Sequence, residues 1–119
     1  MANKPRQPEL LKLVVFVPPS HADAVRQALG EAGAGRIGDY DFCTFSCPGV
    51  GRYRPLPGAQ PYAGELGKLE SVEEERIEAR CTRDNVRAAI EAVRAAHPYE
   101  EPAIDVYPLC SLDELLCSD

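Results

Sequence analysis

The segment that decides the fold is HPYEEPAIDVYPL, which runs from His97 to Leu109. A helical pattern ends at its first residues, because Pro98 has no backbone N–H to donate and disfavours helical geometry in the residue before it. The second half, from Ala103 onward, alternates apolar and polar side chains as strands do. Ile104 and Val106 would then share one face of that strand. The segment therefore marks a junction between a helix and a strand.

A helix leads into this junction. Its apolar stripe recurs at helical spacing and consists of Val86, Ala89, Ile90 and Val93. Side chains from residues 82–85 are expected to cap its start. His97 continues the stripe at the last turn, near the negative end of the helix dipole. That position favours a protonated ring or a hydrogen bond to a free carbonyl.

A strand and a helix also open the domain. Residues 11–17 are apolar on both faces apart from Lys12, which is typical of a central strand. A helix is expected to begin at Ser20 as its N-cap and to end at Gly33 in the manner of a C-cap. Its apolar stripe consists of Val25, Ala28, Leu29 and Ala32.

Two further strands are predicted, at residues 37–46 and 72–81. In the second of these, Ile77 and its alternate neighbours would face helices, while the intervening charged residues would face solvent. The stretch between them, residues 47–71, is rich in glycine and proline. We expect it to form a long loop with at most a short hairpin, and loops of this length are usually functional or mobile.

The order of elements is β-α-β-β-α-β. It predicts an α+β, ferredoxin-like sandwich, with a four-stranded antiparallel sheet, two helices on one face and a long loop between the second and third strands. The expected organisation is a flexible leader at 1–10, one domain at 11–109 and a tail at 110–119. The tail would contain a short helical turn over residues 111–116.

Composition narrows the class of protein. The chain has 119 residues, of which 45% are hydrophobic and 27% charged, as in one soluble globular domain. Its 13 basic and 19 acidic residues give a net charge of −6, which argues against a nucleic acid or an anionic membrane as partner. The longest apolar run, Leu13 to Pro19, is too short to span a membrane.

The cysteines indicate the compartment. There are five, none in a CxxC pair, and no secretory hydrophobic segment precedes Leu10. We therefore expect a cytoplasmic protein with reduced thiols that act as small apolar fillers. No histidine lies near a cysteine in the sequence to act as its base, so no catalytic residue is predicted. An enzyme that acts through Cys47 or a pair of carboxylates stays open as the less favoured alternative.

Two kinds of binding site fit the residues. In the loop, Arg52, Tyr53, Arg54 and Tyr62 are of the types that bind small anions, although exposed arginines are more often merely solvated. At the helix–strand junction, His97 with Glu100 or Glu101 could bind a divalent metal such as Zn²⁺ or Cu²⁺. Because adjacent carboxylates point to opposite sides of an extended chain, only one of them could share a metal with His97. The alternative is a histidine held by neighbouring carbonyl groups.

Several stretches resemble a known family. They are KLVVFVP at 12–18, EAGAGRIGDYDFC at 31–43, GELGKLE at 64–70 and HPYEEPAIDVYPL at 97–109. Together they are similar to the insert domain of YqfO-type proteins, in the family of Nif-three-like dinuclear-metal proteins. The likeness covers about residues 11–109. The HPYE-x-P segment also resembles that of CutA, the trimeric divalent-cation-tolerance protein, and PII signalling proteins share the same plan.

The resemblance implies a CutA/PII-like module that is prone to form an oligomer, a trimer or a dimer, and that acts in regulation or binds a protein partner. In that family the dinuclear metal site comes from lobes flanking the insert, and this sequence contains no such lobes. A hydrolase activity is therefore not implied. The expected function is a non-enzymatic regulatory or binding module that self-associates, with metal binding and small-anion binding as alternatives.

Overall fold

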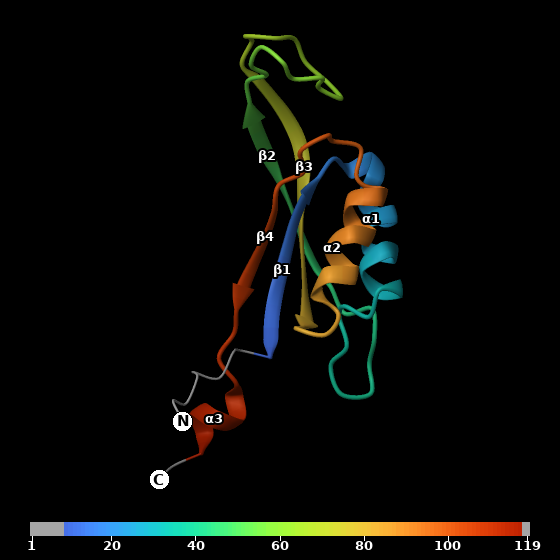
Figure 1. Cartoon of the computed structure of the whole chain (residues 1–119), viewed down its shortest axis with the longest axis vertical. Helices are drawn as coiled ribbons and strands as arrows, with labels where there is room; N and C mark the ends of the chain where they lie inside the picture. The colour runs from blue at the N-terminus through green and yellow to red at the C-terminus, as the bar shows by residue number, and fades with distance from the viewer. Residues whose placement is uncertain (1–8, 118–119) are drawn as a thin grey trace, which may run out of the picture.

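The computed structural model describes residues 9–117. Its elements in chain order are β1 (Leu10–Val17), α1 (Pro19–Glu31), β2 (Phe45–Tyr53), β3 (Glu70–Thr82), α2 (Val86–Ala96), β4 (Ile104–Pro108) and α3 (Leu112–Leu116). The strands form one sheet in the order β2-β3-β1-β4, with every neighbouring pair antiparallel. Helices α1 and α2 lie together on one face of it (Figure 1). The predicted α+β, ferredoxin-like fold is confirmed.

The core lies between the sheet and the two helices, and β1 crosses its centre. Leu13, Val15 and Val17 face the helices and are fully buried. Val14, on the opposite face of the sheet, is also fully buried, because the neighbouring strands place Glu78 and Asp105 on either side of it. Burial on both faces confirms the expectation that this strand is central.

The second strand was predicted in the wrong place. Residues 37–44 contain one turn closed by an isolated bridge between Ile37 and Tyr40 and form no strand. The strand runs instead from Phe45 to Tyr53. It contains Pro48 and two glycines, which weaken a strand signal in the sequence. The sheet tolerates them because β2 is an edge strand, where a missing N–H can face away from the ladder.

The loop between β2 and β3 is shorter than the predicted 47–71, because both strands extend into that range. β3 begins at Glu70 and pairs with β2 along its whole length, from Phe45↔Glu78 to Tyr53↔Glu70. The two strands form a long ribbon that rises beyond the helices (Figure 1). Only residues 54–69 remain outside regular structure at its tip.

Helix ends differ in detail from the prediction. Helix α1 has Pro18, not Ser20, at its N-cap, and no side chain caps it. Its C-terminal end is as expected: Gly33 has a φ of 93°, and the Ala34 N–H donates to the carbonyl of Leu29, which completes a Schellman motif.

Asn85, the N-cap of α2, does not cap that helix with its side chain. Its carboxamide instead accepts from the Thr82 N–H at 2.8 Å and donates to the Gly33 carbonyl at 2.9 Å. The side chain therefore joins the start of α2 to the end of α1.

The tail contains a short helix where a helical turn was predicted. The Ser111 hydroxyl accepts a hydrogen bond from the Glu114 N–H at the start of α3. Residues 1–8 of the predicted leader and residues 118–119 of the tail lie outside the described residues.

All five thiols are free, but only Cys81 is buried, and Cys110 and Cys117 are exposed. The filler interpretation is wrong for these last two, because the tail packs against no core.

Candidate functional site

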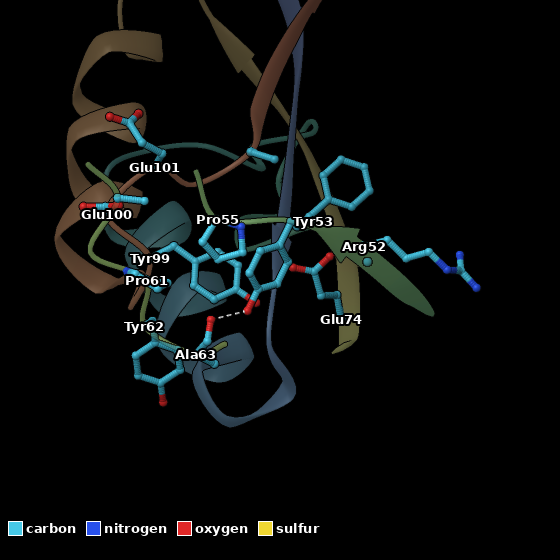
Figure 2. A pocket seen from close by; sticks show the side chains of 14 residues that line it. Arg52, Tyr53, Pro55, Pro61, Tyr62, Ala63, Glu74, Tyr99, Glu100 and Glu101 are labelled. Atoms are coloured by element: carbon cyan, nitrogen blue, oxygen red, sulfur yellow. Dashed lines mark hydrogen bonds between the residues drawn. The ribbon is translucent and has the colours of Figure 1, made fainter. Parts of the chain in front are cut away.

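A cavity of about 280 Å³ lies where the tip of the β2–β3 ribbon meets the segment between α2 and β4. Three tyrosines line it: Tyr53 at the end of β2, Tyr62 in the loop and Tyr99 just after α2. Phe16, at the end of β1, and Pro55, a buried residue of the loop, also line it. The cavity thus gathers aromatic side chains from four separate parts of the chain (Figure 2).

Tyr99 is the centre of the aromatic group. Its ring centroid lies 6.0 Å from that of Tyr62, 6.4 Å from that of Tyr53 and 4.8 Å from that of His97. Separations between 4.5 and 7 Å with tilted planes are the favourable range for aromatic pairs. Tyr99 therefore connects the loop, the ribbon and the helix–strand junction.

Two hydrogen bonds hold the loop against this group. The Tyr53 hydroxyl donates to the carbonyl oxygen of Ala63 at 2.6 Å, as the dashed line in Figure 2 shows. The N–H of Gln60 donates to Oε1 of Glu100 at 2.8 Å. One bond joins the loop to β2 and the other joins it to the segment after α2, so the loop forms a wall of the cavity.

Glu74 supplies a carboxylate to the interior of the cavity. It belongs to β3, and the backbone of Gly51 in β2 lies beside it. A methyl group at Gly51 would occupy the position of the Glu74 carboxylate. Burial, then the negative charge of Glu74 and a hydrogen bond to it, raise the pKa of Tyr99. This phenol therefore stays neutral at physiological pH.

The ring of His97 packs against that of Tyr99, and the residue is only 7% exposed. Its Nε2 lies 2.7 Å from the carbonyl oxygen of Phe16, and its Nδ1 lies 3.2 Å from the backbone nitrogen of Tyr99. A carbonyl can only accept and an N–H can only donate, so the ring carries its proton on Nε2 and is neutral. Burial lowers the pKa of His97. Of the two arrangements that the helix-dipole argument predicts for His97, the structure shows the hydrogen bond to a carbonyl oxygen.

The predicted metal ligands His97, Glu100 and Glu101 are near one another in sequence but differ in their surroundings. Glu100 and Glu101 line the cavity and are exposed, whereas both nitrogens of His97 are engaged in hydrogen bonds. Within residues 9–117, no group of three or more His, Cys, Asp or Glu side chains is arranged to hold a metal ion. Binding a metal through His97 would require one of its two hydrogen bonds to break.

The residues expected to bind an anion are divided by the fold. Tyr53, Tyr62 and Arg52 line the cavity, but Arg54 does not and is exposed. Figure 2 shows the guanidinium of Arg52 directed away from the tyrosines. Three glutamates line the same cavity, so its charge does not favour an anion.

Sequence reasoning missed two members of this site. Glu74 stands in the run Glu73–Glu75, which was interpreted as a solvated strand entry. Tyr99 was visible in the segment after α2, but its partners lie far away along the chain. Only the pairing of β2 with β3 and the fold of the loop place them together.

The geometry defines a class: an α+β domain with a ferredoxin-like sheet and a long β2–β3 ribbon. Among solved structures, CutA from Archaeoglobus fulgidus has this fold, with a TM-score of 0.65 at 19% identity over 90% of this chain and 91% of that one. A Bacillus cereus protein related to NIF3 fits more closely, with a TM-score of 0.77 at 49% identity over 92% of this chain and 28% of that one.

Sequence comparison points to the same family. The chain is 50% identical over 107 residues to a protein of Halalkalibacterium halodurans named GTP cyclohydrolase 1 type 2 homolog, covering 90% of this chain and 29% of the relative. The Bacillus subtilis protein of that name is 49% identical over 100 residues, covering 84% and 27%. No protein-family model matches the chain. The resemblance to YqfO-type, Nif-three-like proteins is confirmed, and the chain spans less than a third of these relatives' length.

Proposed function

We propose that this chain is a non-enzymatic binding module that self-associates through the face of the sheet opposite α1 and α2. The observation that carries the proposal is the make-up of that face. No helix of residues 9–117 covers it (Figure 1), and it presents exposed aromatic rings among paired charges. The occupant that suits it is a second copy of the same chain.

The charges of this face are complementary to themselves. Glu78 sits at its centre and accepts from Lys12 Nζ at 3.3 Å and from Arg76 Nε at 3.2 Å. The guanidinium of Arg76 also lies 5.6 Å from the ring centroid of Phe16. A surface in which acidic and basic groups alternate over a short distance can meet a rotated copy of itself without like charges in contact.

Two exposed aromatic side chains on the same face would contribute favourable free energy to association when a second copy covers them. Phe45, which pairs with Glu78 in the register, is 65% exposed, and Tyr107, which pairs with Lys12, is 43% exposed. Aromatic residues of this kind are enriched in interfaces. Their burial would contribute about 25 cal/mol for each Å² of apolar surface removed from water.

The shape of the chain supports the same proposal. Its radius of gyration is 17.0 Å, whereas a compact domain of this length has a value of about 13–14 Å. The ribbon extends beyond the helices, and the sheet order leaves one edge of β2 and one of β4 without a neighbouring strand in the described part of the chain. Unpaired edges of this kind are a second place, beside the open face, where another copy of the chain can associate.

The wider proposals follow from the comparisons. Oligomerisation as a trimer or dimer and a role in regulation or in binding a protein partner rest on the likeness to CutA and to YqfO-type proteins. No helix within residues 9–117 is long and apolar enough to cross a membrane. A cytoplasmic location remains a proposal from the cysteines, and GTP cyclohydrolase homolog is the name of much longer relatives.

Sedimentation velocity over a wide range of concentration tests self-association. We expect a mass above that of one chain, and we expect Phe45→Lys to shift the equilibrium toward the monomer. Tyr40→Lys is the matched control, because Tyr40 is an aromatic residue that is 75% exposed in the turn before β2. A wild-type chain that stays monomeric at the highest concentration would contradict the proposal, as would equal effects of the two variants.

A further inference from the structure

We propose that the tyrosine-lined cavity at the tip of the β2–β3 ribbon binds a small organic ammonium ion, with a primary or methylated amine as the recognised group. Tyr53, Tyr62 and Tyr99 line this cavity together, with ring centroids about 6 Å apart for the adjacent pairs. The face of an aromatic ring attracts a cation placed within about 6 Å of its centroid. Aromatic side chains that line a cavity are the groups by which proteins recognise alkylammonium ligands.

The charge of the cavity selects the sign of the ligand. Glu74, Glu100 and Glu101 line it together with a single basic residue, Arg52, whose guanidinium points away from the rings (Figure 2). Glu74 lies beside Tyr53 and Tyr99 and is only partly exposed. A carboxylate next to aromatic faces in a partly desolvated cavity stabilises a cation and repels an anion.

The site is held in place before any ligand arrives. The Tyr53 hydroxyl is bonded to the Ala63 carbonyl, and the Tyr99 ring rests on that of His97, 4.8 Å away between centroids. Glu100 accepts the N–H of Gln60. Rings whose orientation is already set lose little side-chain freedom on binding, which favours affinity.

The size of the cavity sets the size of the ligand. A volume of about 280 Å³ lies just below the range of about 300–1,000 Å³ that is usual for small-molecule sites. It suits a choline-sized ion. All its lining residues come from one chain, so the inference does not depend on self-association, and either proposal can fail while the other holds.

The test uses two probes of nearly equal shape and different charge. Choline carries a quaternary ammonium group, and 3,3-dimethyl-1-butanol replaces its nitrogen with carbon and is neutral. Binding is followed for the full chain by two-dimensional NMR, with sedimentation run beside it to report any change in mass. We expect choline to cause saturable shifts of the Tyr53, Tyr62 and Tyr99 signals. The affinity for the neutral alcohol should be lower by a factor of about ten or more.

Two pairs of variants locate the site. Glu74→Gln removes the cavity carboxylate and should weaken choline binding about ten-fold, whereas Glu73→Gln makes the same change at the adjacent exposed position and should not. Tyr62→Ala should weaken binding about five-fold, and Tyr62→Phe should restore most of it because the ring is kept. Tyr62 is 56% exposed, so neither change threatens the fold.

Three results would overturn the inference. They are equal affinity for choline and the neutral alcohol, equal loss in Glu74→Gln and Glu73→Gln, and no saturable binding of choline at tens of millimolar. Shifts confined to residues far from the cavity would also contradict it.

Discussion

The imidazole Nε2 of His97 lies 2.7 Å from the carbonyl oxygen of Phe16, which is 81 positions earlier in the chain. This hydrogen bond joins the end of α2 to the end of β1, directly beneath the cavity. The other ring nitrogen accepts the N–H of Tyr99. The histidine therefore orients the segment that carries Tyr99, Glu100 and Glu101.

Replacing His97 should destabilise the fold. His97→Ala removes both hydrogen bonds, leaves the Phe16 carbonyl without its partner and creates a cavity, so we expect a loss of about 2–4 kcal/mol in the free energy of unfolding. The measurement is urea denaturation, read from the midpoint at unchanged slope. His21→Ala is the control. The His21 side chain hydrogen-bonds to its neighbour Ser20 and meets the Tyr62 ring edge-on, with centroids 6.0 Å apart, but it is partly exposed and leaves no buried carbonyl unpaired when removed. Its loss should therefore cost about 1 kcal/mol or less. Similar losses in the two variants would show that His97 has no special structural role.

Stability should fall on mild acidification. Burial lowers the pKa of His97 below its ordinary 6.5 in the folded chain, and its bond to Phe16 and the charge of Glu74 offset only part of this. The unfolded chain therefore binds more protons in this range, and stability rises with pH. The contribution is complete above pH 6.5 and is lost progressively as the pH falls toward the folded pKa.

The same denaturation series in His97→Gln isolates this effect. Glutamine does not titrate, so the slope of stability against pH between roughly pH 7 and 5 should be smaller than in the wild type. The pKa of Glu78 is also shifted: burial raises it, but the bonds from Arg76 and Lys12 outweigh burial and lower it overall. Its contribution is therefore lost at more acidic pH. Identical slopes in both proteins would contradict the assignment to His97.

Gly35 should be intolerant of a side chain. Its φ is 85°, and an added Cβ would lie 2.7 Å from the oxygen and 2.8 Å from the nitrogen of the Cys43 backbone. Its own N–H donates to the Arg80 carbonyl, so it cannot shift freely. We expect Gly35→Ala to cost about 3 kcal/mol.

Gly38 provides the matched comparison for Gly35. Its φ of 57° is also positive, but nothing lies within 4 Å of an added Cβ. Gly38→Ala should therefore cost only about 1 kcal/mol, from the backbone conformation alone. Thermal unfolding of both variants measures the difference. A larger loss at Gly38 would show that the approach to Cys43 is not what constrains this turn.

A metal titration tests the remaining alternative. Both nitrogens of His97 are engaged, so we expect His97→Gln to leave any response to Zn²⁺ or Cu²⁺ unchanged relative to its own metal-free form. Thermal shift of metal-stripped protein is the measurement, and a native-state ligand at a hundred times its Kd adds about 2.7 kcal/mol. A stabilisation that disappears in His97→Gln and in Glu100→Gln would make metal binding the function of this segment.

The sequence by itself determined the order of the elements, the α+β class and the central place of β1. Each of these depends on the local period of apolar residues, which is visible within a short window. It also singled out Tyr53, Tyr62, Glu100 and Glu101 from residue type and from their loop positions.

Only the tertiary structure decided where β2 lies and what the site contains. Pro48, Gly49 and Gly51 oppose a strand locally, and the strand exists because β3 supplies its partner over the whole ribbon. The same pairing turns Glu74 inward from a run of three glutamates. It also brings Tyr53 to within 6.4 Å of Tyr99, centroid to centroid. Strand register and loop closure are interactions between distant segments, so no local pattern records them.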